Sequence, residues 1–213
     1  MRPFTIDLDP ADTDDNGIAD DLPTGTAWVF GTDAEWIRQD ITDGLAHRLI
    51  CTTAGNEASG NAPILTVVGT DADGNVQTEA ITLPDTTTVE STKYFKTIAT
   101  LTTQAATIST FDIGWVDEVQ SQTYPLDYRA TNAASYACTE TGTVTWFLAE
   151  TFQDISEVSA PAQDARWFDT ATVISASAVT VGTLNATAVR ATIATYTNTG
   201  ELQVDVCQGA RSR

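Results

Sequence analysis

The stretch ILTVVGTDADGNVQTEAITL, residues 64–83, decides the fold class of this chain. Two runs rich in β-branched residues, Ile64–Thr70 and Val76–Leu83, flank the turn sequence Asp71–Asn75. Asp73-Gly74 supplies the positive φ that a tight reversal between two strands needs. The stretch therefore predicts an antiparallel β-hairpin.

The C-terminal region carries the same strand signal. Leu202, Val204 and Val206 alternate with polar residues, so one face of this strand is expected to be buried and the other wet. We predict a second hairpin here, in which Ala188–Tyr196 turns at residues 198–200 into Glu201–Gln208. The same alternation occurs upstream, at Val144, Trp146 and Leu148.

The whole chain follows this pattern, because threonine and valine are frequent and turn signals recur at short spacing. We predict an all-β fold of two antiparallel β-sandwich domains, Ig-like or jelly-roll-like. Residues 1–25 are expected to form an extended N-terminal arm that orders only against a partner. The first sandwich is expected at residues 26–120 and the second at 121–213. Asp33–His47 is the one segment whose pattern allows a short helix.

The charge of the chain narrows its partners. Ten Lys and Arg stand against 29 Asp and Glu, which gives a formal net charge of −19. Such a charge repels phosphate backbones and anionic lipids, so we expect neither nucleic acid nor membrane as a partner. Residues 1–10 are acidic where a secretory signal needs an apolar run, so we expect folding in a cytoplasm.

Side chains that carry most enzyme chemistry are scarce. His47 is the single histidine, whereas a Ser-His-Asp or Cys-His mechanism needs an imidazole with a nucleophile in reach. No nucleophile elbow, P-loop or dinucleotide fingerprint occurs. Cys51, Cys138 and Cys207 are odd in number and lack paired spacing, which favours buried, unpaired thiols over disulfides or a zinc site. We therefore expect no catalytic residues and a structural role for His47.

One acidic stretch, residues 12–21, matches the DxDxNGxxD spacing of a calcium loop. Asp12, Asp14, Asn16 and Asp20 supply oxygen ligands, with Gly17 at the turn. Pro23 stands where a bidentate Glu normally closes such a loop. The alternative is an Asx-rich acidic turn without metal. Calcium is therefore the one cofactor that the sequence suggests, with these four residues as its candidate ligands.

The five tryptophans could serve as a carbohydrate-stacking platform or as core residues. Four of them lie near apolar, strand-like stretches, so we predict core packing. The five are Trp28, Trp36, Trp115, Trp146 and Trp167.

Two sets of residues resemble virion proteins encoded near the head and tail genes of tailed bacteriophages. The first set is Val67, Gly69, Thr70, Asp71, Gly74, Glu79, Ile81 and Leu83, followed by Phe95 and Ile98. The second is Gly142, Thr143, Thr151, Asp154, Trp167, Phe168, Arg190, Tyr196, Gly200 and Gln208. Together they cover most of Ala62–Gln208. The resemblance implies a structural role in a phage particle.

Within that role, we expect a capsid decoration (cement) protein that binds the outside of the head shell. Its partners would be the major capsid protein or other virion proteins, and it would act as a homo-oligomer, with a trimer favoured. A tail, neck or fibre component is the alternative within the same class. A calcium-dependent glycan-binding module is the alternative from another class, and it requires several exposed tryptophans and a metal-bound Asp12–Asp21 loop.

Overall fold

The computed structural model describes residues 3–55, 62–83, 87–107, 109–130, 132–170 and 173–208. Strands account for 59% of the described chain, and the sheets are antiparallel. The one helix in this part of the chain is the single turn α1 (Pro161–Asp164). The all-β prediction is therefore confirmed. No described helix has the length and apolar character needed to cross a membrane.

The chain divides into two compact units, and the division is not the one expected. Unit 1 combines residues 1–12 with residues 117–213, and unit 2 is formed by residues 13–116. The sequence instead predicted a separate arm over residues 1–25 and a boundary at residues 120–121. Residues 1–2 and 209–213 of these predicted segments lie outside the described part of the chain.

Unit 2 is built from two sheets. In spatial order, one of them joins β2 (Asp14–Leu22), β9 (Phe111–Gln120), β4 (Ala46–Thr53) and β7 (Thr88–Phe95). These strands are part of a ten-stranded sheet that also includes strands of unit 1, and residues 117–120 of β9 belong to unit 1. The other joins β3 (Ala27–Trp28), β8 (Thr97–Thr103), β5 (Ile64–Thr70) and β6 (Val76–Thr82). The sheets meet through a buried core, in which the Trp28 ring lies edge-on to Phe111 at 4.9 Å.

The predicted hairpin at residues 64–83 is confirmed. β5 and β6 pair from Ile64↔Thr82 to Thr70↔Val76. The buried carboxylate of Asp71 accepts hydrogen bonds from the backbone N–H groups of Asp73 at 2.9 Å and Asn75 at 2.8 Å. Gly74 adopts φ +83°, as the turn requires. A side chain inside the loop, in addition to the glycine, therefore fixes this reversal.

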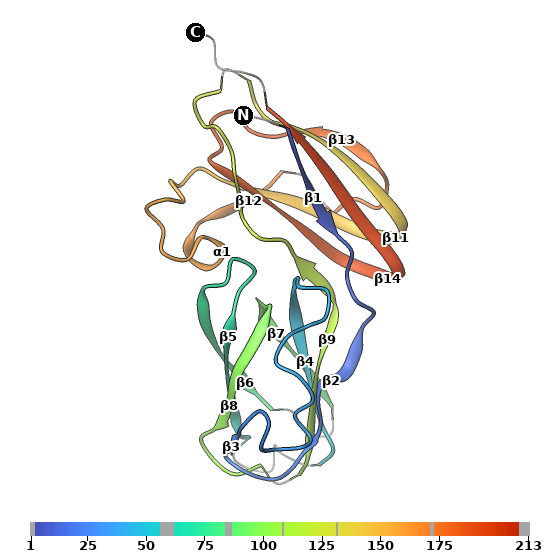
Figure 1. Cartoon of the computed structure of the whole chain (residues 1–213), viewed down its shortest axis with the longest axis vertical. Helices are drawn as coiled ribbons and strands as arrows, with labels where there is room; N and C mark the ends of the chain where they lie inside the picture. Colours follow the sequence, from blue (N-terminus) through green and yellow to red (C-terminus); the bar gives the residue numbers. More distant parts are fainter. Residues whose placement is uncertain are drawn as a thin grey trace. The chain divides into compact units, whose positions relative to one another are not determined.

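Unit 1 is organised by two long strands, β11 (Ser135–Thr151) and β14 (Ala188–Cys207), which pair along their whole length. The pairing is interrupted between Thr141 and Thr143, opposite residues 198–200. On one side of this corner, β13 (Ala178–Val181) and β1 (Phe4–Leu8) flank the pair. On the other side, the flanking strands are β12 (Trp167–Asp169), β10 (Tyr124–Pro125) and the end of β9. Figure 1 shows the two arms of this bent ribbon.

The corner explains why the second predicted hairpin is wrong. Residues 188–196 and 201–208 do not pair with each other, because both pair with β11 as parts of one strand. The turn signals at Gly142 and Gly200 mark a bend in two neighbouring strands instead. Gly142 adopts φ +76°, and a Cβ on Gly200 would lie 2.9 Å from the Tyr196 Cβ. Glycine at a sharp bend in a ribbon is a known use of this residue.

The expected N-terminal arm is also wrong over the residues described. β1 pairs with β14 from Phe4↔Val206 to Leu8↔Leu202 (Figure 1). Ile6 and Leu8 are fully buried, and so are Ile18 and Leu22 on β2. On β1 the buried residues alternate with exposed ones, so one face of the strand lies in a core. On β2 the buried residues are Gly17–Ala19 and Leu22, in an irregular strand, and they too lie in a core despite the acidic residues around them.

The short helix allowed at Asp33–His47 is not formed. This segment contains turns and isolated bridges, and His47 belongs to β4. The Trp36 indole N–H donates to the Arg38 carbonyl, and Trp36 bridges to Ala19 on β2. A local side-chain hydrogen bond and a backbone bridge to β2 therefore accompany the non-helical conformation here.

Candidate functional site

Three of the four predicted calcium ligands lie on strand β2, which is extended and bulged. The Asn16 side-chain N–H donates to Asp20 Oδ1 at 3.0 Å, and the Asn16 backbone N–H lies 3.3 Å from Asp14 Oδ1. Asn16 therefore presents its amide nitrogen, and not its oxygen, to Asp20. Asp12 belongs to unit 1, whereas the other three belong to unit 2.

Gly17 has a different role from the loop glycine that the calcium pattern requires. It does not adopt a positive φ. A Cβ at this position would lie 2.4 Å from the Trp115 ring, so the glycine lets β2 approach β9 closely. Within the described residues, no group of three or more His, Cys, Asp and Glu side chains could hold a metal ion.

His47 is buried and held by hydrogen bonds. Its Nε2 lies 2.7 Å from Asp43 Oδ2, and its Nδ1 lies 3.3 Å from the Val116 carbonyl oxygen. Both partners accept, so both contacts are satisfied when each ring nitrogen carries a proton. The imidazole is thus engaged on both sides by residues of its own fold.

The most constrained polar cluster surrounds Glu150, a residue that the sequence analysis did not select. Glu150 is 1% exposed. Its Oε1 accepts a hydrogen bond from the Tyr136 hydroxyl at 2.5 Å, and its Oε2 accepts one from the Thr183 backbone N–H at 2.7 Å. Burial, followed by the hydrogen bond to Glu150, raises the pKa of Tyr136 far above its usual range.

Gly182 completes this cluster. A Cβ on Gly182 would lie 1.9 Å from Glu150 Oε1 and 2.8 Å from the Tyr136 ring, so only glycine fits. The cluster joins both arms of the bent ribbon to the loop after β13. The sequence does contain an indication of this site. Glu150 follows Trp146 and Leu148 at a spacing of two residues, so its side chain is expected on the same buried face of the strand.

Two of the three cysteines are core residues. Cys51 and Cys138 are buried, and burial raises the pKa of each thiol to about 12. Such thiols stay protonated and behave as small apolar side chains. The prediction of a buried thiol is wrong for Cys207, which is exposed at the end of β14.

Core packing of the tryptophans is confirmed for four of the five. Trp28, Trp36 and Trp115 are 3% exposed and Trp146 is fully buried. Trp167 is partly exposed, and the Arg190 guanidinium lies 4.3 Å from its ring centroid. A glycan-binding platform of several exposed tryptophans is therefore not formed.

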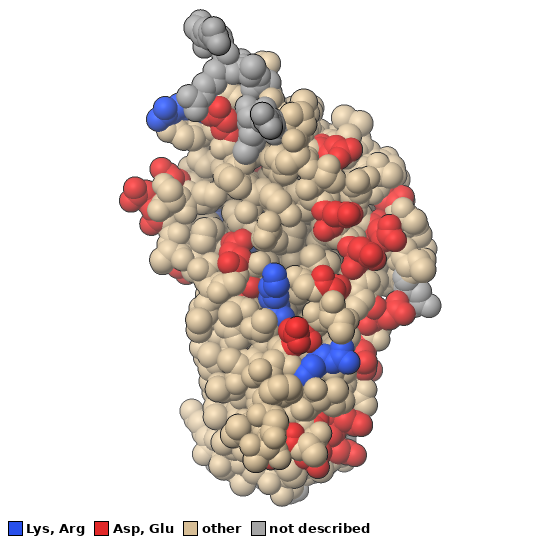
Figure 2. Space-filling view, in the orientation of Figure 1, with Lys and Arg blue, Asp and Glu red and all other residues tan. Residues whose placement is uncertain are grey.

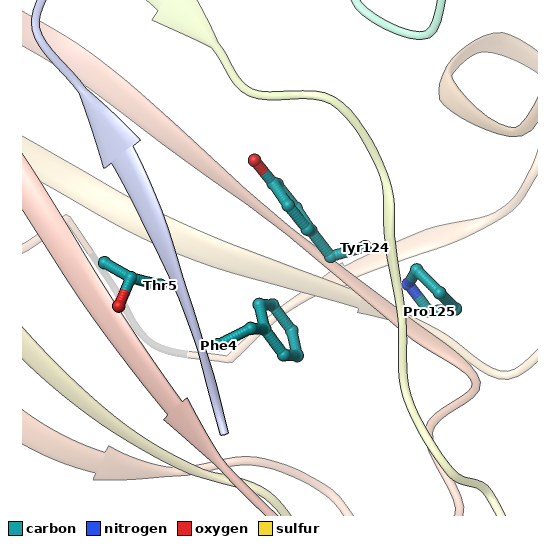
Figure 3. Close-up of a pocket in the computed structure, with 4 residues that line it drawn as sticks. All are labelled: Phe4, Thr5, Tyr124 and Pro125. Atoms are coloured by element: carbon teal, nitrogen blue, oxygen red, sulfur yellow. The ribbon is translucent and has the colours of Figure 1, made fainter. Parts of the chain in front are cut away.

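An apolar pocket of about 260 Å³ lies in unit 1, lined by Phe4, Thr5, Tyr124 and Pro125 (Figure 3). The Phe4 and Tyr124 rings stack, with centroids 5.4 Å apart and planes inclined by 17°. β1 and β10 supply these residues, and they pair with opposite halves of β14. Phe4 pairs with Val206 and Tyr124 pairs with Val189, so the pocket lies beside the two ends of β14, away from the corner.

Among the charged side chains on the face seen in Figure 2, acidic ones are more numerous than Lys and Arg, and uncharged residues cover most of that face. The pocket of Phe4 and Tyr124 is able to take up an apolar side chain, because burial of apolar surface away from water is favourable. Comparison with protein family models, with curated proteins and with solved structures gives no match.

Proposed function

We propose that this chain is a non-enzymatic structural protein of a tailed-phage particle, and that it decorates the outside of the head shell. It would bind the major capsid protein as a homo-oligomer, with a trimer favoured, after folding in the host cytoplasm. Nucleic acid and membranes would not be its partners. The resemblance of residues 62–208 to virion proteins supports the class of function.

The observation that carries the proposal is where the polar and the apolar groups lie. Glu150 and His47, the buried groups best suited to proton chemistry, are held by residues of their own fold. The aromatic pocket of Phe4 and Tyr124 is instead open at the surface. An engaged interior and an apolar surface pocket favour recognition over catalysis.

The proposal extends to the fold of each unit, which we take to be a β-sandwich. In unit 2, the edge-on contact between Trp28 on β3 and Phe111 on β9 supports face-to-face packing of two sheets. In unit 1, the contact between Tyr136 and Glu150 supports packing of one ribbon arm over the other. Such sandwiches are rigid, which suits a shell component.

Cryo-electron microscopy of particles from the organism that carries this gene would test the proposal. We expect density for this chain at many symmetric positions on the outer shell. Density only at the tail, neck or fibres would favour the alternative position. Absence of the chain from purified particles, measured by mass spectrometry, would contradict a virion role.

A binding experiment would test the pocket. The purified protein would be added to head shells that do not contain it. The Phe4→Ser variant should bind these shells about tenfold more weakly or worse, because an aromatic anchor is lost. Phe152→Ser is the matched control, since Phe152 is also in unit 1 and is 45% exposed. Equal binding by wild type and Phe4→Ser would exclude the pocket as the contact.

A further inference from the structure

Strand β13 (Ala178–Val181) forms an open edge of the sheet in unit 1. It pairs with β11 from Ser135↔Val181 to Cys138↔Ala178, and no described strand pairs with its other side. Natural edge strands are usually protected by a charge, a proline or a bulge. β13 contains only Ala, Val and Thr, so it has neither a charged residue nor a proline.

The backbone orientation of β13 follows from one hydrogen bond. The Gly182 N–H donates to the Ala134 carbonyl at 2.8 Å, so residue 182 faces β11. In an antiparallel pair, alternate residues face the same neighbour, so Thr180 faces β11 as well. Val179 and Val181 therefore direct their N–H and C=O groups to the open edge.

The side chains around this edge are apolar and exposed. Val179 is 77% exposed and Val181 is 63% exposed. Leu184, in the loop that follows β13, is exposed too, at 49%. The sequence has no charged residue between Asp169 and Arg190, which is exceptional in a chain of net charge −19. On the neighbouring strand, the residues opposite the two valines are the uncharged Ala137 and Ser135.

These features indicate that a second copy of this chain binds to the open edge of β13. Two copies with 19 excess negative charges each repel one another, so they can approach closely only where both surfaces lack charge. The β13 edge of one copy and the β13 edge of a second copy are both uncharged, so together they meet this condition. A basic partner would gain nothing from an uncharged strand and would bind the acidic surface instead.

We infer that two copies of the chain pair through β13, antiparallel and about a two-fold axis at Thr180. Val179 of one copy lies opposite Val181 of the other, and their N–H and C=O groups form the hydrogen bonds of a continuous sheet. The two Thr180 residues face each other as a pair without mutual backbone hydrogen bonds. This isologous contact gives a dimer and not the trimer favoured above.

The inference rests on the homo-oligomer of the proposed function and revises its size, because it assigns the surface through which the oligomer forms and makes that oligomer a dimer in place of the trimer. Its test needs no particle. A four-residue strand buries less area than a standard interface, so we expect a dissociation constant of about 10⁻⁶ M or weaker. Raising sodium chloride from about 0.1 M to about 1 M shortens the screening length from about 10 Å to about 3 Å and should strengthen the dimer.

Sedimentation equilibrium of the purified full chain provides the test. We expect a monomer–dimer equilibrium in which Val179→Lys and Val181→Lys each weaken the dimer at least tenfold. Val179→Pro should do the same, because it removes an edge-facing N–H and leaves the β11 pairing intact. Val76→Lys is the matched control, since Val76 is 72% exposed on β6 in the other unit.

A cross-link would establish the register. Thr180→Cys in a Cys207→Ser background should form a disulfide-linked dimer on oxidation, because facing residues of such a pair have Cα atoms about 4.5 Å apart. Circular dichroism confirms that each variant is folded. A monomer at about millimolar concentration, a trimer, or a dimer that persists in Val179→Lys and Val181→Lys would overturn the inference. None of these results would bear on whether the chain is present in a particle.

Discussion

The Tyr136 hydroxyl donates a hydrogen bond to Glu150 Oε1 over 2.5 Å, although the two residues lie 14 positions apart on one strand. A straight strand of that length would separate them by about 46 Å. The contact exists because β11 and β14 bend together at Gly142 and Gly200. It fastens one arm of the ribbon to the other.

Removing this hydrogen bond should destabilise the protein. Tyr136→Phe leaves a buried carboxylate oxygen without its donor, so the free energy of unfolding should fall by about 1–3 kcal/mol. Chemical denaturation followed by tryptophan fluorescence would measure the change. Tyr128→Phe is the control, because Tyr128 is 45% exposed, and its effect should stay within about 0.5 kcal/mol. Equal stability of the two variants would show that the contact is dispensable.

A methyl group at Gly182 should disrupt the same cluster. Gly182→Ala would bring a Cβ to 1.9 Å from Glu150 Oε1, and the loop or the carboxylate must move. We expect a loss of about 1–3 kcal/mol in the free energy of unfolding. At Gly25, a Cβ would lie 3.6 Å from the Trp28 ring, which is an ordinary contact, so Gly25→Ala should be tolerated. Similar losses in both variants would contradict the steric explanation.

The N-terminal strand should contribute to stability. Ile6→Ala and Leu8→Ala each empty a fully buried site, and each should cost about 2–5 kcal/mol of unfolding free energy. Asp7→Asn changes an exposed residue between them and should have little effect. Thermal denaturation of the three variants would compare them. Unchanged midpoints for Ile6→Ala and Leu8→Ala would restore the hypothesis of a detached arm.

Stability should decline in alkali because of the buried thiols. Burial raises the pKa of Cys51 and Cys138 from 9.0 to about 12, so above pH 9 the unfolded chain loses these protons and the folded chain keeps them. Each thiol should then lower the unfolding free energy by about 1.4 kcal/mol per pH unit between pH 9 and 12. Because the pKa of Tyr136 is also raised, its hydroxyl should lower the free energy of unfolding further above pH 10.

Denaturation at several pH values would measure this slope. The double variant Cys51→Ala/Cys138→Ala should show a shallower decline than the wild type. Cys207→Ala removes an exposed thiol and should retain the wild-type slope. A slope that is the same in all three proteins would assign the decline to other groups.

Calcium should not stabilise the protein selectively. The Asn16 amide nitrogen faces Asp20, and Gly17 serves the packing of Trp115, so β2 lacks the arrangement of a calcium loop. A true site would add about 2.7 kcal/mol at a hundredfold excess of calcium over its dissociation constant. Thermal midpoints in calcium and in magnesium at equal ionic strength should agree. A calcium-specific rise that is lost in Asp14→Ala, but kept in Asp73→Ala, would establish the site.

The sequence predicted those features that depend on near neighbours. The hairpin at Asp71–Asn75 and the buried face of Leu202, Val204 and Val206 follow from local alternation and turn chemistry, and both are present. Glycine was ambiguous, because the same residue serves a reversal at Gly74, a corner at Gly142 and a close approach at Gly17. Which of these applies depends on what packs there, and a single sequence does not state that.

The candidate surfaces were less predictable for the same reason. Glu150 lay in phase with a buried face, but its partners Tyr136 and Thr183 come from distant positions in the chain. Phe4 was assigned to an arm because acidic residues surround it, and its stacking on Tyr124 depends on the pairing of β1 with β14. The edge of β13 became visible only once its neighbours were known.

The pairing of β1 with β14 has a consequence for biosynthesis. Thr5 and Asp205 are hydrogen bonded although 200 residues separate them, so β1 leaves the ribosome long before its partner strand exists. Unit 2 is continuous in sequence and can fold while the chain is still growing, whereas unit 1 must wait. Until β14 has been synthesised, the apolar face of β1 is uncovered. Nascent chains should be most prone to aggregate, or to need a chaperone, during this interval.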